Sequence, residues 1–198
     1  MSFESCLVIS GLASHPFGSW QIHGHDKSFM WIRDELPQRL PGVRFLAYGY
    51  DTTLSDSTSF QLISDLAISL VHTVKVIGWS APSAKPVLFL AHSLGGVVLK
   101  QALAILAGGG STERSILAKI NGSIFFGVPS QGMSIPDIFE MLGDQPNVAL
   151  VKDLSDQSDF LHRLDEQFGN ISYLQRIQFF WAFETKVTPS VRVSLAHF

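Results

Sequence analysis

The chain contains a single cysteine, Cys6, among its 198 residues. One thiol excludes a framework of intramolecular disulfide bonds and is typical of proteins from a reducing compartment. Because Cys6 lies in an apolar run, we expect it to be a packed core thiol. The N-terminus also lacks the basic start and long apolar stretch of a secretory signal. These features predict a cytoplasmic protein.

Charged residues are scarce, at 16% of the chain, and the net charge is only -3. This charge gives no reason to expect nucleic acid as a partner. No apolar run approaches the ~18 residues of a membrane-spanning helix, so no transmembrane segment is expected. A mean hydropathy of +0.23 and fifteen phenylalanines leave peripheral contact with an organelle membrane, or with a protein partner, open. A well-filled core explains them more simply.

Three histidines, His15, His23 and His25, lie close together in one polar and aromatic segment. No cysteine or carboxylate accompanies them at the spacing of metal ligands, so we interpret them as solvated loop residues. The sequence therefore predicts neither a metal site nor an organic cofactor.

The most informative stretch is 86–101, PVLFLAHSLGGVVLKQ. Its apolar start predicts a short buried strand, and the apolar residues after Gly96 recur at helical spacing. Between them, Ala91-His92-Ser93-Leu94-Gly95-Gly96 is a variant of the G-x-S-x-G turn with Ala91 in place of the first glycine. Such a turn lifts Ser93 above the carboxyl edge of a sheet and directs the first N–H groups of the helix toward it. The alternative is an ordinary strand-to-helix junction that happens to contain a serine.

Apolar periodicity predicts the other elements along the chain. Strands are expected at 6–9, 43–50, 123–128 and 177–183, and helices near 29–36, 60–77, 116–120, 135–142, 148–154 and 160–168. The expected helix caps are Ser28 for the first helix, which Pro37 and Pro41 should limit, and Asp56, Ser57 and Ser59 for the second.

This alternation of strand and helix predicts an α/β fold with a mostly parallel sheet and helices on both faces. Ligands of such sheets bind at the carboxyl ends of the strands, where Ser93 is expected. The length fits a single domain over 1–198. Within it, segment 130–176 separates two strands and is predicted to be a helical, lid-like insertion.

The loop after the first strand, Ser10-Gly11-Leu12, is a second candidate for chemistry. In acyl-transfer enzymes with such a turn, one oxyanion-hole N–H follows the nucleophile and another comes from a loop after an earlier strand. Leu94 and Leu12 are the candidates. The alternative is that Gly11 only permits a turn.

Several stretches, taken in order, resemble one known family. They are VISGLASHPFGSW, MWIRDELPQRLPGVRFLAYGYD, PVLFLAHSLGGVVLKQAL, SIFFGVPSQGM and FFWAFETKVTP. Together they are similar to the α/β-hydrolase superfamily, and specifically to intracellular serine esterase or lipase-like domains of the serine-active-site-containing and DUF676 groups. Similar domains stand at the N-terminus of fungal multidomain signalling proteins. The resemblance implies hydrolysis of a carboxylic ester or lipid.

The resemblance also implies site residues. Ser93 would be the nucleophile, Leu12 and Leu94 the oxyanion donors, and Glu184, after the last strand, the acid of a catalytic triad. Competing carboxylates in the insertion are Asp137, Asp153, Asp156 and Asp159. A serine hydroxyl needs an imidazole to accept its proton, and His197 is the only histidine after Glu184. The other histidines considered, His72, His92 and His162, are not placed as a triad base would be.

The chain departs from the family pattern at four places. Ser10 stands where the family usually has histidine, Ser130 stands where a histidine after proline is common, and Ala91 replaces a glycine. The family's base follows a further strand that this sequence does not contain, so the C-terminus is expected to be truncated relative to the family. A triad without its base loses about 10⁴-fold in turnover. The alternative is therefore a catalytically impaired, hydrolase-like binding or signalling module.

Overall fold

The computed structural model describes residues 4–13, 15–21, 28–51, 53–54, 56–134, 142 and 144–183. Five strands form one sheet: β1 (Glu4–Ile9), β2 (Val43–Tyr48), β3 (Val87–His92), β4 (Ile120–Phe126) and β5 (Gln178–Ala182). Their order is β2-β1-β3-β4-β5, and every neighbouring pair is parallel. The parallel sheet predicted from the sequence is thus confirmed.

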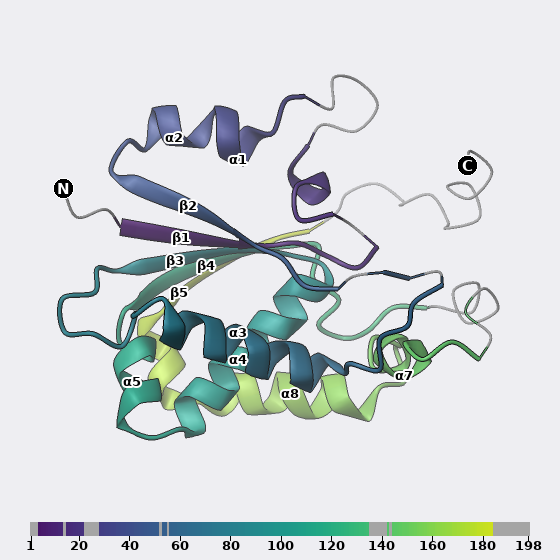
Figure 1. The fold of residues 1–198 in the computed structure, drawn as a ribbon. Coiled ribbons are helices and arrows are strands. Elements are labelled where there is room, and N and C mark those ends of the chain that lie inside the picture. The colour runs from purple at the N-terminus through teal and green to yellow at the C-terminus, as the bar shows by residue number, and fades with distance from the viewer. Residues whose placement is uncertain are drawn as a thin grey trace.

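Helices cover both faces of this sheet (Figure 1). One face carries α1 (Trp31–Asp34) and α2 (Leu36–Arg39), and the other carries α3 (Ile63–Val76), α4 (Leu94–Gly108), α5 (Ser111–Leu117) and α8 (Asp159–Asn170). Shorter elements are η1 (Gly18–Trp20), α7 (Val148–Lys152) and η2 (Ser172–Arg176). The sheet is therefore the middle of three layers.

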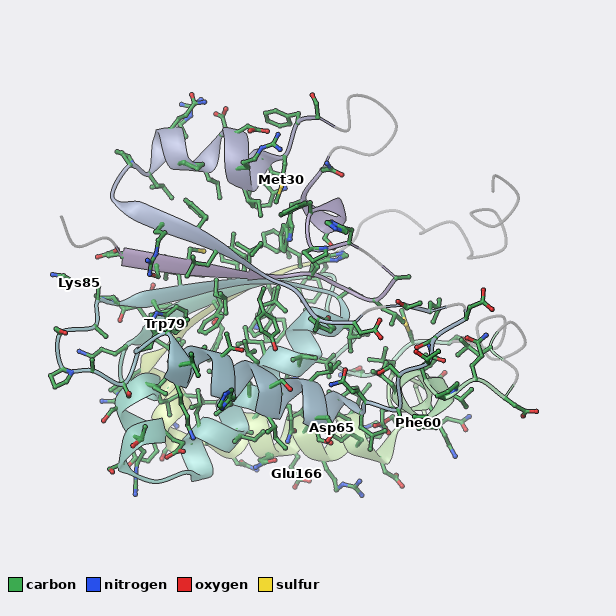
Figure 2. The ribbon with its side chains drawn as sticks, viewed as in Figure 1. Met30, Phe60, Asp65, Trp79, Lys85 and Glu166 are labelled. Atoms are coloured by element: carbon green, nitrogen blue, oxygen red, sulfur yellow. The ribbon has the colours of Figure 1, made fainter. Side chains whose placement is uncertain are left out.

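Side chains alternate between the two faces, and each face has its own hydrophobic core. In β1, Leu7 and Ile9 join the larger core against α3 and α4, whereas Cys6 and Val8 join the smaller core near α1. Figure 2 shows Met30 on the α1 side of the sheet and Trp79 on the α3 side. Burial raises the pKa of the Cys6 thiol to about 12, so it stays protonated and unreactive near neutral pH.

The strand order reverses between β1 and β3. The chain moves from β1 outward to β2, returns to β3 on the other side of β1, and then continues toward β5. In parallel sheets the crevice outside the carboxyl ends of two such strands is the usual ligand site. The loop after Ile9 and the turn after His92 both lie at this point.

The first predicted helix differs from the structure. Instead of one helix over 29–36 there are two short ones, and Pro37 lies in the first turn of α2 rather than after the end of a helix. Proline fits there because the first turn needs no donor from its backbone. The expected cap, Ser28, is also wrong: Met30 is the N-cap, and its N–H donates to Asp34 Oδ2 at 2.7 Å.

The start of α3 was also predicted too early. The helix begins at Ile63, beyond the expected caps Asp56, Ser57 and Ser59. The side chain that satisfies its first turn is Asp65, whose Oδ2 accepts the N–H of Leu62 at 2.9 Å. Apart from Leu142, the helix predicted at 135–142 lies outside the described residues.

Candidate active site

Ser93 lies between the end of β3 and the first residue of α4. Its backbone has φ 51° and ψ -126°, a conformation that non-glycine residues rarely adopt and that stores strain. Two hydrogen bonds hold it: Ser93 N–H donates to the Phe126 carbonyl, and Gly96 N–H donates to the Ser93 carbonyl, both at 2.9 Å. The serine is half-buried rather than enclosed in the core. The chain therefore makes the strand, sharp turn and helix that the sequence predicts.

Gly95 allows this turn to approach the loop after β1. A Cβ atom at Gly95 would overlap the carbonyl oxygen of Ser10 and would stand 2.8 Å from the Ile9 carbonyl oxygen. Similarly, a Cβ atom at Gly11 would be 2.8 Å from the Cβ of Ser93. The β1 loop and the Ser93 turn are consequently in direct contact, which only small residues permit.

Gly95→Ala should therefore be severely damaging. The added methyl meets backbone atoms, which cannot move aside as the end of a flexible side chain can. We expect a loss of roughly 2–4 kcal/mol in the free energy of unfolding, measured by urea titration. Gly169→Ala, at a position on α8 with nothing within 4 Å, is the matched control and should be neutral or slightly stabilising. Equal stability of the two variants would contradict this packing.

Ser10 anchors the β1 loop. Its buried hydroxyl donates to the Pro16 carbonyl at 2.8 Å and accepts from Trp20 Nε1 at 3.2 Å, while its own carbonyl accepts from the Tyr50 hydroxyl at 2.7 Å. Burial raises the pKa of Tyr50, so this phenol remains a donor throughout the neutral range. The residue that departs from the family pattern thus has a structural role here, which the sequence alone did not reveal.

Two backbone N–H groups are candidates to face a ligand at Ser93. Leu94 is the first residue of α4, so its N–H has no acceptor within the helix. Leu12 follows Gly11 in the loop that touches Ser93, and it is half-buried. The two N–H groups belong to the two segments that meet where the strand order reverses: Leu94 to the turn after β3, and Leu12 to the loop after β1.

The predicted acid and base cannot be placed. Glu184 and His197 lie outside the described residues, which end at Phe183, just after β5. Three further histidines lie on separate described elements: His72 and His162 are exposed on α3 and α8, and the ring of His92 packs edge-on against Trp20 at 6.3 Å between centroids.

The competing carboxylates belong to another region. Asp153, Asp156 and Asp159 line a cleft of about 830 Å³ at α7 and α8. Burial raises the pKa of Asp153, whereas Asp159 is simply the first residue of α8. Asp137 lies outside the described residues. None of the described residues that line this cleft belongs to the Ser93 turn.

Another cleft, of about 550 Å³, lies at the segment after β4, and none of the described residues that line it belongs to the Ser93 turn itself. Its lining includes Val128, which contacts the Gly96 position from the segment after β4. Ser130, Asp165 and Trp181 also line it. Lys100 of α4 contacts Ser130 and Asp165, and this role was not predicted. The buried apolar residues at helical spacing around it, Val97, Leu103 and Ala104, already indicated that this lysine needs a buried partner.

Over the ranges that the structure describes, no three histidine, cysteine or acidic side chains gather as a metal site would require. His23 and His25 lie outside these ranges. Within the same ranges, no helix is both long enough and apolar enough to cross a bilayer.

Over the described residues, the all-parallel strand order with a serine turn at the point of reversal fits an α/β-hydrolase fold. Solved structures agree. Phospholipase PlaB from Legionella pneumophila, in complex with thio-NAD, superposes with a TM-score of 0.62 at 14% identity, over 90% of this chain and 37% of that one. Lipase BlEst2 from Bacillus licheniformis, in its mature form, gives 0.55 at 14% identity, over 89% and 63%. The chain therefore has an α/β-hydrolase-like fold, similar to that of these two lipases.

Among curated proteins, the chain is similar to Protein SERAC1 from several vertebrates. It is 25% identical to the Bos taurus protein over 181 residues and 26% identical to the Danio rerio protein over 185 residues. These alignments cover 82% and 84% of the chain, but only 27% and 28% of the relatives. The chain therefore spans little more than a quarter of the length of the relatives it matches. No protein-family profile matches it.

Proposed function

We propose that this chain is a serine hydrolase that cleaves carboxylic esters or lipids through an acyl-enzyme on Ser93. The observation that carries the proposal is the strained backbone of Ser93 at the carboxyl edge, in contact with the loop after β1. Strain of this kind is retained where the surrounding structure holds a side chain for chemistry. The lipase and phospholipase folds that this chain resembles support the same class of substrate.

In the proposed reaction, Ser93 Oγ attacks the ester carbonyl carbon and its proton passes to the imidazole of His197. Glu184 orients that imidazole. The N–H groups of Leu12 and Leu94 stabilise the negative oxygen of the tetrahedral intermediate. The imidazolium then protonates the departing alcohol, which leaves an acyl group on Ser93. Water, deprotonated by the same imidazole, releases the acid.

We assign the described residues Ser130 and Asp165 of the insertion 130–176 to the wall of the substrate cleft. Ser130 and Asp165 line the cleft whose Val128 contacts the Gly96 position of the Ser93 turn, and Leu161 and Leu164 of α8 belong to the larger core. Since α8 is anchored in this way, the cleft has a fixed wall on the β4 and β5 side. The apolar lining by Val128, and by residues near the end of β5, favours an acyl chain over a highly charged substrate.

The alternative is a hydrolase-like module that binds an acyl ligand or a protein without turnover. A series of p-nitrophenyl esters with acyl chains from acetate to palmitate distinguishes the two. The hydrolase is expected to release p-nitrophenol catalytically, with a preference along the series that reflects the cleft. Tight binding of an ester without turnover would favour the module instead.

A further inference from the structure

Lys100 is a fully buried lysine, with only 2% of its side chain exposed, on the helix that begins at the Ser93 turn. Its ammonium lies 2.5 Å from Asp165 Oδ1 of α8 and donates to Ser130 Oγ at 3.3 Å. It also lies 5.2 Å from the ring centroid of Phe168 and 5.8 Å from that of Trp181. Four segments therefore meet at the Lys100 ammonium: α4, the segment after β4, α8 and β5.

Three of these partners line the cleft at the segment after β4, which reaches the Ser93 turn through the contact of Val128 with the Gly96 position. Ser130, Asp165 and Trp181 all line that cleft, and Trp181 is further held by stacking on Phe125 at 4.4 Å between centroids. Because Lys100 is two helical turns along α4 from Ser93, it joins the wall to the same rigid element that carries the turn. The Lys100 ammonium donates to two oxygen atoms of this wall, Ser130 Oγ and Asp165 Oδ1.

We propose that Lys100 is a positioning residue that fixes the wall of the substrate cleft relative to Ser93. This inference rests on the proposed hydrolase function for its kinetic consequence, but its structural consequence can be measured without a substrate. Asp165 is 49% exposed, so the pair is formed by a buried cation and a carboxylate that water can reach. Substituting Lys100 and substituting Asp165 should therefore lower the stability of the protein by different amounts.

Lys100→Met is the informative variant. Methionine keeps much of the apolar volume of the lysine stem, and the Asp165 carboxylate that remains can be solvated. In contrast, Asp165→Asn leaves a buried, uncompensated ammonium and is expected to lower the melting temperature much more. Glu166→Gln is its matched control, because Glu166 is exposed on the outer side of α8, which faces away from the sheet (Figure 2).

The experiment measures amide hydrogen exchange and ester kinetics on the full chain. In Lys100→Met we expect the amides of 128–134 to exchange about tenfold faster than in the wild type, because the wall opens locally. We also expect KM for p-nitrophenyl esters to rise about fivefold with kcat changed less than about twofold, since Ser93 itself is undisturbed. The control is Lys75→Met, which removes a different interhelical pair, that of Lys75 in α3 with Glu113 of α5 at 2.5 Å. It should leave both quantities unchanged.

Each outcome decides something. Unchanged exchange at 128–134 in Lys100→Met would overturn the inference, whether or not the protein hydrolyses esters. Faster exchange with an unchanged KM would reduce Lys100 to a purely structural residue and would also overturn it. If Lys100→Met speeds exchange at 128–134 but the wild-type protein hydrolyses no ester, the proposed function is contradicted. The role of Lys100 in holding the wall is then still supported.

Discussion

Ser93→Gly is expected to abolish ester hydrolysis while making the fold more stable. Glycine adopts φ 51° without the steric penalty that serine has there. Releasing strain of about 1–3 kcal/mol, less the roughly 0.5–1 kcal/mol by which glycine favours the unfolded chain, should raise the melting temperature by a few degrees. The loss of the nucleophile should lower kcat by about 10⁴-fold or more.

The matched variant is Ser93→Ala. Alanine also lacks the hydroxyl but keeps the Cβ atom and hence the strain, so activity should disappear with little change in melting temperature. Calorimetry and ester hydrolysis on the three proteins separate the two effects. If Ser93→Gly melted lower than Ser93→Ala, the backbone at Ser93 would not be strained, and if either variant kept its turnover, Ser93 would not be the nucleophile.

His197→Gln is expected to lower kcat by about 10⁴-fold, because without an imidazole the Ser93 hydroxyl has no group to take its proton. Binding of a non-hydrolysable ester analogue should change little, since the cleft and the backbone donors remain. His162→Gln is the control, because this histidine is exposed on α8. Wild-type turnover in His197→Gln would remove His197 from the mechanism and require another base.

The local pattern of the sequence predicted the sheet and the Ser93 turn well, for a physical reason. Buried parallel strands need short, continuous apolar runs, and the run at 87–90 is followed by small residues that only a tight turn requires. The strand-to-helix change of periodicity is local as well. Hence the approximate positions of β1, β2, β3 and β5 could all be predicted from nearby residues.

Helix starts were predicted less well because a polar residue ahead of an apolar pattern need not be the cap. Before α3, three hydroxyl or carboxyl side chains precede the apolar pattern, yet Asp65, inside the helix, makes the hydrogen bond to the N-cap. Similarly, Pro37 looked like the end of a helix but lies in the first turn of another. Which candidate caps a helix depends on where tertiary packing starts that helix, and a single sequence does not contain this.

The parts of the site that depend on distant contacts could not be predicted. Lys100 and Asp165 are 65 positions apart, and Ser10 and Tyr50 are 40 apart. A polar residue within an apolar helix indicates that a partner exists, but not which one. The role of Ser10 was hidden for the same reason, because its hydrogen bonds form only when Trp20 and Tyr50 fold against the loop.

The most direct test of the account is labelling of the intact chain with a fluorophosphonate, followed by mass spectrometry of the protein and its peptides. This reagent reacts by far the fastest with a serine that is activated as a nucleophile. The account predicts one adduct per chain, located on Ser93 and absent from Ser93→Ala. A folded wild-type protein that carries no adduct, or carries it on a different serine, would contradict it.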